Sequence, residues 1–198
     1  MAYVASINIG QPQVASWAGI GRTSIDKVSI TGPVEVHSLG IAGDQVSDLR
    51  HHGGVDQAVY AFAREDLDRW GEVLGQPIRD GQFGENLTTA GIDVNQALIG
   101  EQWRIGTVLL EITDVRIPCN VFKNWMGESG YDKLAWVKRF TAEGRPGPYL
   151  RVLEEGTLQA GDELHVLRRP DHGVSVSAYF QAQTTNRAAL AELKAAIR

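Results

Sequence analysis

The segment Trp103-Arg-Ile-Gly-Thr-Val-Leu-Leu-Glu-Ile-Thr-Asp-Val-Arg-Ile-Pro-Cys119 decides the fold class, because it carries the longest β-strand pattern in the chain. From Val108 to Ile112 every second residue is apolar, which is the period of a strand with one buried face. From Val115 onward the apolar residues continue with the opposite parity. Because strand side chains alternate between the two faces, this change predicts a β-bulge near Thr113-Asp114.

The segment ends in Pro118 and Cys119, the single cysteine of the chain. Proline has no N–H to donate, so it ends regular pairing and places the thiol where a strand exits into a loop. Simple alternation would turn Cys119 inward with Val115 and Ile117, and Arg116 the other way. A free cysteine is often a small buried hydrophobe, whereas a nearby arginine favours the reactive thiolate. Both interpretations stay open, and Cys119 is the first candidate for chemistry.

Similar short apolar runs occur along the rest of the chain, and most end in glycine or another turn residue. We expect strands over residues 3–9, 26–30, 34–36, 58–62, 103–117, 150–152 and 163–167, of which 26–30 and 34–36 should pair as a hairpin. Many short strands with glycine-rich turns favour a mainly β, barrel-like fold with a few peripheral helices over a sheet of β-α-β units.

Helical periodicity is confined to a few segments, which are residues 64–74, 132–140, 175–181 and 186–198. A break in pattern around residues 168–173 separates two parts. We therefore predict a β-barrel domain over residues 1–170 and a helical C-terminal tail over residues 171–198. The tail is expected to pack on the body or on a partner.

Composition limits the classes of function. The 198 residues are 43% hydrophobic, enough for a core, and their net charge of −5 with no long basic run argues against a nucleic-acid partner. One cysteine cannot form an internal disulfide, which suits a reducing compartment. The start of the chain lacks a signal-peptide pattern, and no apolar stretch is long enough to span a membrane. These features predict a cytoplasmic protein without a membrane partner.

The segment Arg50-His-His-Gly-Gly54 is one of two further candidate motifs. Adjacent histidines in extended chain point in opposite directions, so they are poor joint ligands, and no CxxC or HxxxH spacing predicts a protein-only zinc site. The two glycines permit close approach of a ligand, although a loop with one structural histidine is the simpler interpretation.

The other motif is Phe83-Gly-Glu-Asn-Leu87. The amide of Asn86 offers both a donor and an acceptor to the edge of a heterocycle. The alternative is a turn in which Asn86 caps its own backbone.

These segments, in the order His52-Gly53-Gly54, Phe83–Leu87 and Arg116–Cys119, resemble the MOSC domain family, which is named after the C-terminal domain of molybdenum-cofactor sulfurases. The chain is similar to its small stand-alone bacterial type over about residues 38 to 167. The resemblance implies a β-barrel-like fold and either a molybdenum cofactor (molybdopterin) or the handling of sulfur. Members that carry the cofactor reduce N-hydroxylated compounds, including base analogues.

Carried over residue by residue, the resemblance makes Cys119 the catalytic residue and the metal ligand. The cofactor-binding positions that it implies are Arg50, His52, Gly53, Gly54, Glu85, Asn86 and Arg116. The expected activity is that of a molybdenum-cofactor-dependent oxidoreductase that detoxifies N-hydroxylated substrates. The cofactor need not remain on the purified protein. Glu101 departs from the family, where an aspartate is common.

Two alternatives remain. Cys119 could carry a persulfide as a sulfur carrier, or it could be inert in a non-catalytic ligand-binding barrel. A cysteine hydrolase would need a base, and only the fold could bring His51 or His52 to the thiol. The expected partners are a small-molecule substrate, the pterin cofactor, an electron-donor protein or a cysteine desulfurase, and a second copy in a homodimer.

Overall fold

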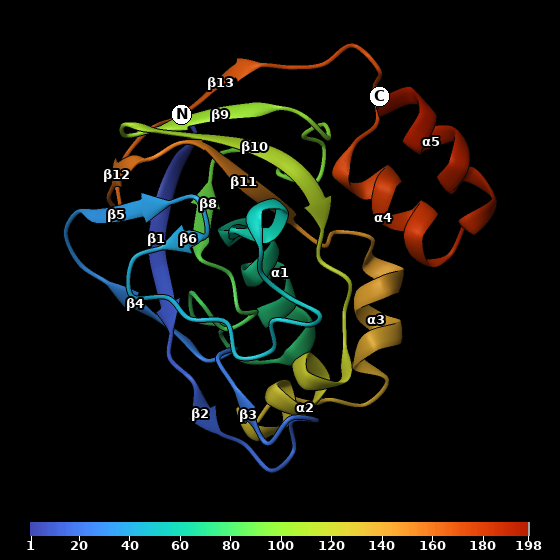
Figure 1. Ribbon diagram of the computed structural model, residues 1–198. Coiled ribbons are helices and arrows are strands. Elements are labelled where there is room, and N and C mark those ends of the chain that lie inside the picture. Colours follow the sequence, from blue (N-terminus) through green and yellow to red (C-terminus); the bar gives the residue numbers. More distant parts are fainter. Residues whose placement is uncertain (198) are drawn as a thin grey trace.

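The computed structural model describes residues 1–197 and is dominated by one curled sheet with helices along its side (Figure 1). The sheet has eight strands, in the spatial order β13 (Leu164–Arg168), β9 (Gln102–Ile105), β10 (Val108–Val115), β11 (Pro148–Glu154), β7 (Val59–Ala63), β8 (Leu87–Ala90), β1 (Tyr3–Gly10) and β4 (Lys27–Ile30). Two small sheets accompany it, one of β12 (Gly156–Leu158), β5 (Val34–His37) and β6 (Gly40–Ile41), the other of β2 (Gln13–Val14) and β3 (Arg22–Thr23).

The predicted barrel is incomplete. The beginning of β1 approaches the beginning of β13 through an isolated bridge between Tyr3 and Glu163, supported by backbone bonds such as Leu164 N to Ala2 O at 2.9 Å. No ladder joins β1 to β13 in residues 1–197, and β4 continues the sheet beyond β1. The fold is therefore a mixed, sheet-dominated one rather than a closed barrel.

The segment of residues 103–119 forms strands partly as predicted. It divides into β9 and β10, which form a hairpin around Gly106-Thr107. The register of β10 against β11 shifts between Ile112 and Asp114, which confirms the predicted bulge.

The predicted side-chain directions after the bulge are right for Val115 but wrong for Arg116 and Ile117. Val115 and Arg116 are both buried, whereas Ile117 is 40% exposed. Strict alternation ends with β10 at Val115, and the backbone N–H of Arg116 donates to Gly147 O over 3.3 Å. The guanidinium of Arg116 lies in the interior, where it bonds the Tyr149 hydroxyl.

Two long-range pairings also differ from expectation. Strands β7 and β8 run parallel, joined by helix α1 (Arg64–Leu74), so the fold contains one β-α-β unit after all. Strands β4 and β5 do not form the predicted hairpin, because β4 pairs with β1 while β5 pairs with β12 and β6. Turn residues specify where the chain bends, but they do not specify which strand each flanking segment pairs with.

Helix α1 has the predicted bounds, whereas the later helices differ. Helix α2 (Asn120–Glu128) was not predicted, and α3 (Trp136–Glu143) begins later than the expected segment 132–140. The tail contains three elements in place of the two predicted helices: α4 (Val176–Thr184), the short 3₁₀ turn η2 (Arg187–Ala189) and α5 (Leu190–Ile197). The predicted end of the last helix at residue 198 lies outside the described residues. A further 3₁₀ turn, η1, covers Val55–Gln57.

An aromatic cluster fixes α2 and α3 against the loop before β8. Phe122 of α2 packs edge-on against Phe83 and Trp136, with ring centroids 5.1 and 5.3 Å apart. All three side chains are fully buried. Because such rings contribute large apolar areas, the cluster holds the first turn of α2 firmly in place.

The helical tail contacts the sheet through its first helix. Phe180 of α4 is buried against Phe140, and Gln183 donates to Asp114 over 2.9 Å. The division into domains at residue 170 stays a prediction. Within residues 1–197 no helix is long and apolar enough to cross a membrane.

Candidate functional site

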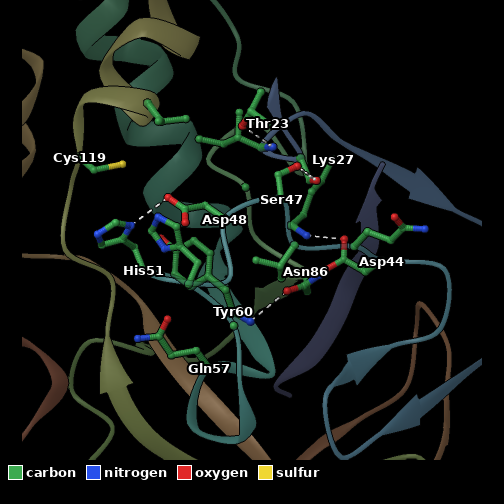
Figure 2. Close-up of a pocket in the computed structure, with 18 of the residues that line it drawn as sticks. Thr23, Lys27, Asp44, Ser47, Asp48, His51, Gln57, Tyr60, Asn86 and Cys119 are labelled. Atoms are coloured by element: carbon green, nitrogen blue, oxygen red, sulfur yellow. Dashed lines mark hydrogen bonds and ion pairs between the residues drawn. The ribbon is translucent and has the colours of Figure 1, made fainter. Parts of the chain in front are cut away.

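A pocket of about 380 Å³ opens between the loop after β6, the segment around β3 and the start of α2 (Figure 2). Cys119 and His51 lie on one side of it, and Lys27, Asp44 and Asn86 lie on the other. The volume falls within the range of small-molecule and cofactor sites.

Cys119 occupies the N-cap position of α2, with extended backbone dihedrals of φ −128° and ψ 173°. Its carbonyl accepts from Lys123 N over 3.1 Å, which begins the helix. The thiol is half-buried and lines the pocket. A helix N-terminus favours a negative charge, so this position suits a thiolate.

The surroundings of Cys119 lower its pKa to about 6. Burial by itself would raise the pKa of the thiol, but a hydrogen bond with the His52 side chain, the positive charge of Arg116 and the backbone N–H of Phe122 outweigh burial. Most of Cys119 is therefore a thiolate at neutral pH. This environment favours a reactive thiol over an inert one.

Arg116 is the buried cation beside the thiolate. It is 7% exposed, and its guanidinium carbon lies 5.6 Å from the ring centre of Tyr60 and 5.2 Å from that of Phe122. Nη1 donates to the hydroxyl of Tyr149 over 3.1 Å, whereas the buried Nε has no partner in residues 1–197. Burial opposes the charge, but Tyr149 and Cys119 outweigh it and raise the pKa of Arg116, so it stays cationic.

A second buried cation, Lys27 at the start of β4, forms an ion pair with Asp44. Asp44 also accepts from Gly10 N over 2.7 Å and from Asn86 Nδ2 over 2.8 Å. Burial lowers the pKa of Lys27, and Asp44 opposes that effect. Sequence reasoning missed this pair, although a lysine inside an apolar strand segment was a signal for it.

Asn86 lines the pocket, but its amide is used within the protein. Nδ2 donates to Asp44 and to Asn8 O, the latter over 3.2 Å, and Oδ1 accepts from Tyr60 N over 3.2 Å. The amide is thus engaged on both its donor and its acceptor side. In this structure Asn86 shapes the pocket wall instead of presenting a heterocycle-binding edge.

Both histidines of the loop after β6 line the same pocket as Cys119. His52 also helps to lower the pKa of the thiol. His51 Nδ1 lies 3.0 Å from Asp48 Oδ2 (Figure 2). No group of three His, Cys, Asp or Glu side chains that could hold a metal ion occurs in the described residues.

The structure brings five of the eight sequence-predicted site residues to the pocket: Cys119, His52, Gly53, Asn86 and Arg116. The other three, Arg50, Gly54 and Glu85, do not line it.

Arg50 and Gly54 are exposed. Glu85 is fully buried and accepts from Gly81 N over 2.5 Å and Phe83 N over 3.0 Å, so it holds the loop that carries Asn86. Burial raises the pKa of Glu85 to about 7.

Comparison with known proteins gives consistent matches. The family model of the MOSC domain matches residues 48–165. The Bacillus subtilis protein YflK is 33% identical over 174 residues, which cover 87% of this chain and 76% of YflK. A protein of Gibberella moniliformis named "Reductase" is 28% identical over 83% of this chain, which spans only 29% of that longer protein. The crystal structure of YiiM from Geobacillus stearothermophilus superposes with a TM-score of 0.80 and 26% identity, covering 98% of this chain and 91% of YiiM.

Proposed function

Because this chain belongs to the MOSC domain family, we propose that it binds a molybdenum cofactor and reduces N-hydroxylated compounds, with Cys119 as the metal-ligating thiolate. The observation that carries the proposal is the low pKa of Cys119, about 6, in a pocket that it shares with Arg116 and His52. The fungal relative named "Reductase" agrees with a redox function.

The residues of the pocket fit such a cofactor. A thiolate is the soft ligand that a molybdenum centre favours, by analogy with other metals that prefer sulfur. The buried Nε of Arg116 has no partner in residues 1–197 and can donate to an anionic or carbonyl group. Arg22 adds a positive charge to the lining, which suits the phosphate of a pterin cofactor, and the ammonium group of Lys27 lies in the same lining, paired with Asp44.

We assign the metal to Cys119, and the polar groups of the cofactor to Arg116, Lys27 and His52. Gly53, with φ +78°, lets the backbone of the loop after β6 approach a ligand closely. When bound, the cofactor supplies the two-electron chemistry of the reduction.

The protein residues have three tasks in this proposal. Arg116 and His52 keep Cys119 deprotonated, so that binding of a metal releases few protons at neutral pH. His52 can hold a proton at its ring nitrogen beside the thiol. The hydroxyls of Ser24 and Ser47, 2.6 Å apart on the pocket wall, can bond a polar substrate.

A second candidate is a sulfur carrier, and the same thiolate favours it. In that reaction the Cys119 thiolate attacks the outer sulfur of a desulfurase persulfide, a Cys119 persulfide forms, and the desulfurase cysteine leaves as a thiolate. After incubation with a cysteine desulfurase and cysteine, mass spectrometry would show one added sulfur on the wild type and none on Cys119→Ser.

An activity assay tests the first candidate. The reaction is RNHOH + 2e⁻ + 2H⁺ → RNH₂ + H₂O, with a chemical reductant as the electron source. Cofactor-loaded wild type should convert an N-hydroxylated base analogue to its amine, whereas Cys119→Ser treated in the same way should not. A loaded wild type that reduces no N-hydroxylated compound would contradict the proposal.

A further inference from the structure

Residues 144–147 form a strap that joins α3 to β11 next to Arg116. Pro146 O accepts from the hydroxyl of Tyr60 over 2.7 Å, and Gly147 O accepts from Arg116 N over 3.3 Å. Tyr60 also stacks against the guanidinium of Arg116. The strap therefore holds both the backbone of Arg116 and one of the rings that flank its side chain.

Asn95 anchors this strap from outside the pocket. Its side chain is fully buried, Oδ1 accepts from Gly147 N over 3.0 Å, and Nδ2 donates to Asp66 Oδ2 over 2.8 Å. Asp66 Oδ1 in turn accepts from Arg145 Nε over 2.6 Å, so a second strap residue is tied to the same network. A buried amide without hydrogen-bond partners would lower the stability of the protein, and here both Oδ1 and Nδ2 of Asn95 have a partner.

The strap has little freedom on the side away from Asn95. Gly147 has φ +72°, and a Cβ added there would lie 2.3 Å from Ala61 O of β7. Close packing on one side and the Asn95 bond on the other define where Gly147 lies. Since Gly147 bonds Arg116, they also define where the backbone of Arg116 lies.

We propose that Asn95 is a positioning residue of the pocket: through Gly147 it fixes the backbone of Arg116 and the start of β11, which carries Tyr149. Asn95 lies outside the pocket lining and touches no candidate ligand group. The proposal concerns the protein's own geometry, so it stands or falls independently of the ligand that the pocket takes.

Three variants test the hydrogen-bond path. Asn95→Leu removes both bonds with a side chain of similar size, and Asn95→Asp places a carboxylate against Asp66. The double variant Asn95→Asp with Asp66→Asn restores the path with the two residue types exchanged. The carboxylate at position 95 again accepts from Gly147 N, and it also accepts from the amide at position 66. The net charge of this pair is unchanged.

Two readouts report on Arg116 rather than on stability. The first is the Nε–H resonance of Arg116 in ¹⁵N NMR, which is assigned by its loss in Arg116→Lys. Because Nε is buried, this hydrogen should exchange slowly in the wild type. The second is the hydrogen-exchange rate of the backbone N–H of Arg116, which donates to Gly147 O.

In Asn95→Leu and Asn95→Asp the Nε–H resonance should shift and exchange faster. The backbone N–H of Arg116 should also exchange faster, because Gly147, which carries its acceptor, is no longer held by Asn95. The double variant should recover both readouts. As a control, Leu67→Ala removes a buried side chain next to Asp66 without touching the path, and it should change neither readout.

The proposal is overturned if a folded Asn95 variant keeps both wild-type readouts of Arg116, or if the folded double variant does not restore them. Should Asn95→Leu fail to fold, the comparison of Asn95→Asp with the double variant decides the matter. Equal effects in Leu67→Ala would also overturn it, because loss of packing would then explain the result.

Discussion

Arg116 donates a hydrogen bond from Nη1 to the hydroxyl of Tyr149 over 3.1 Å, and both side chains line the same pocket as Cys119. Tyr149 pairs with Asp114 immediately after the register shift in β10. The bulge and the bond after it thus bring the arginine next to the tyrosine. In the described residues Arg116 forms no ion pair with a carboxylate, and its side-chain hydrogen bond goes to Tyr149 instead.

Removing the Tyr149 hydroxyl should destabilise the protein. In Tyr149→Phe the buried guanidinium of Arg116 loses its hydrogen-bond acceptor, so the free energy of unfolding should fall by about 1–2 kcal/mol. Urea denaturation measures this difference. Tyr179→Phe is the matched control, since Tyr179 is half-buried on α4 and should lose less than about 0.5 kcal/mol. Equal losses in the two variants would contradict the role of the Tyr149 hydroxyl.

The reactivity of Cys119 should follow its low pKa. Alkylation by iodoacetamide should be half-maximal near pH 6, because the thiolate is the nucleophile. In His52→Ala the burial that raises the pKa stays while one opposing hydrogen bond is lost, so the half-maximal point should move to higher pH.

His51→Ala is the control for this series. His51 pairs with Asp48, and its loss should leave the alkylation profile in place. A profile centred above pH 8 in the wild type, or an equal shift in both histidine variants, would show that His52 does not maintain the thiolate.

The ion pair of Lys27 and Asp44 should behave as a coupled unit. Lys27→Met leaves the buried carboxylate of Asp44 without its cation and should lower the free energy of unfolding by about 3 kcal/mol. Adding Asp44→Asn removes the unpaired charge, so the double variant should be more stable than Lys27→Met alone. Chemical denaturation of the wild type, both single variants and the double variant gives the coupling energy, and strictly additive losses would contradict a direct pair.

The sequence predicted the features of this fold that depend on local patterns. The parity change after Ile112 identified the bulge, and the helical spacing of Leu67, Trp70 and Leu74 gave α1 with its observed bounds. Helix α2 escaped prediction because its stability comes from burying Phe122 in a cluster built by distant segments.

Features that depend on long-range contacts could not be predicted in the same way. The buried position of Arg116 depends on its contacts with Tyr149 and Gly147, which come from a distant part of the chain. The presence of His52 and Cys119 in one pocket likewise depends on long-range packing. Asn86 was identified as a pocket residue, but only the structure shows that its amide is engaged by Asp44 and Tyr60. The motifs thus located the pocket, and the distant contacts defined what each side chain does there.

The most direct test of the central claim is the molybdenum and pterin content of the protein purified from a host that makes the cofactor, compared between the wild type and Cys119→Ser. Tyr179→Phe is purified in parallel as a control for handling. The account predicts stoichiometric molybdenum and pterin in the wild type and the control, and loss of molybdenum in Cys119→Ser. Wild type without molybdenum even after reconstitution, or equal molybdenum in Cys119→Ser, would contradict Cys119 as the metal ligand.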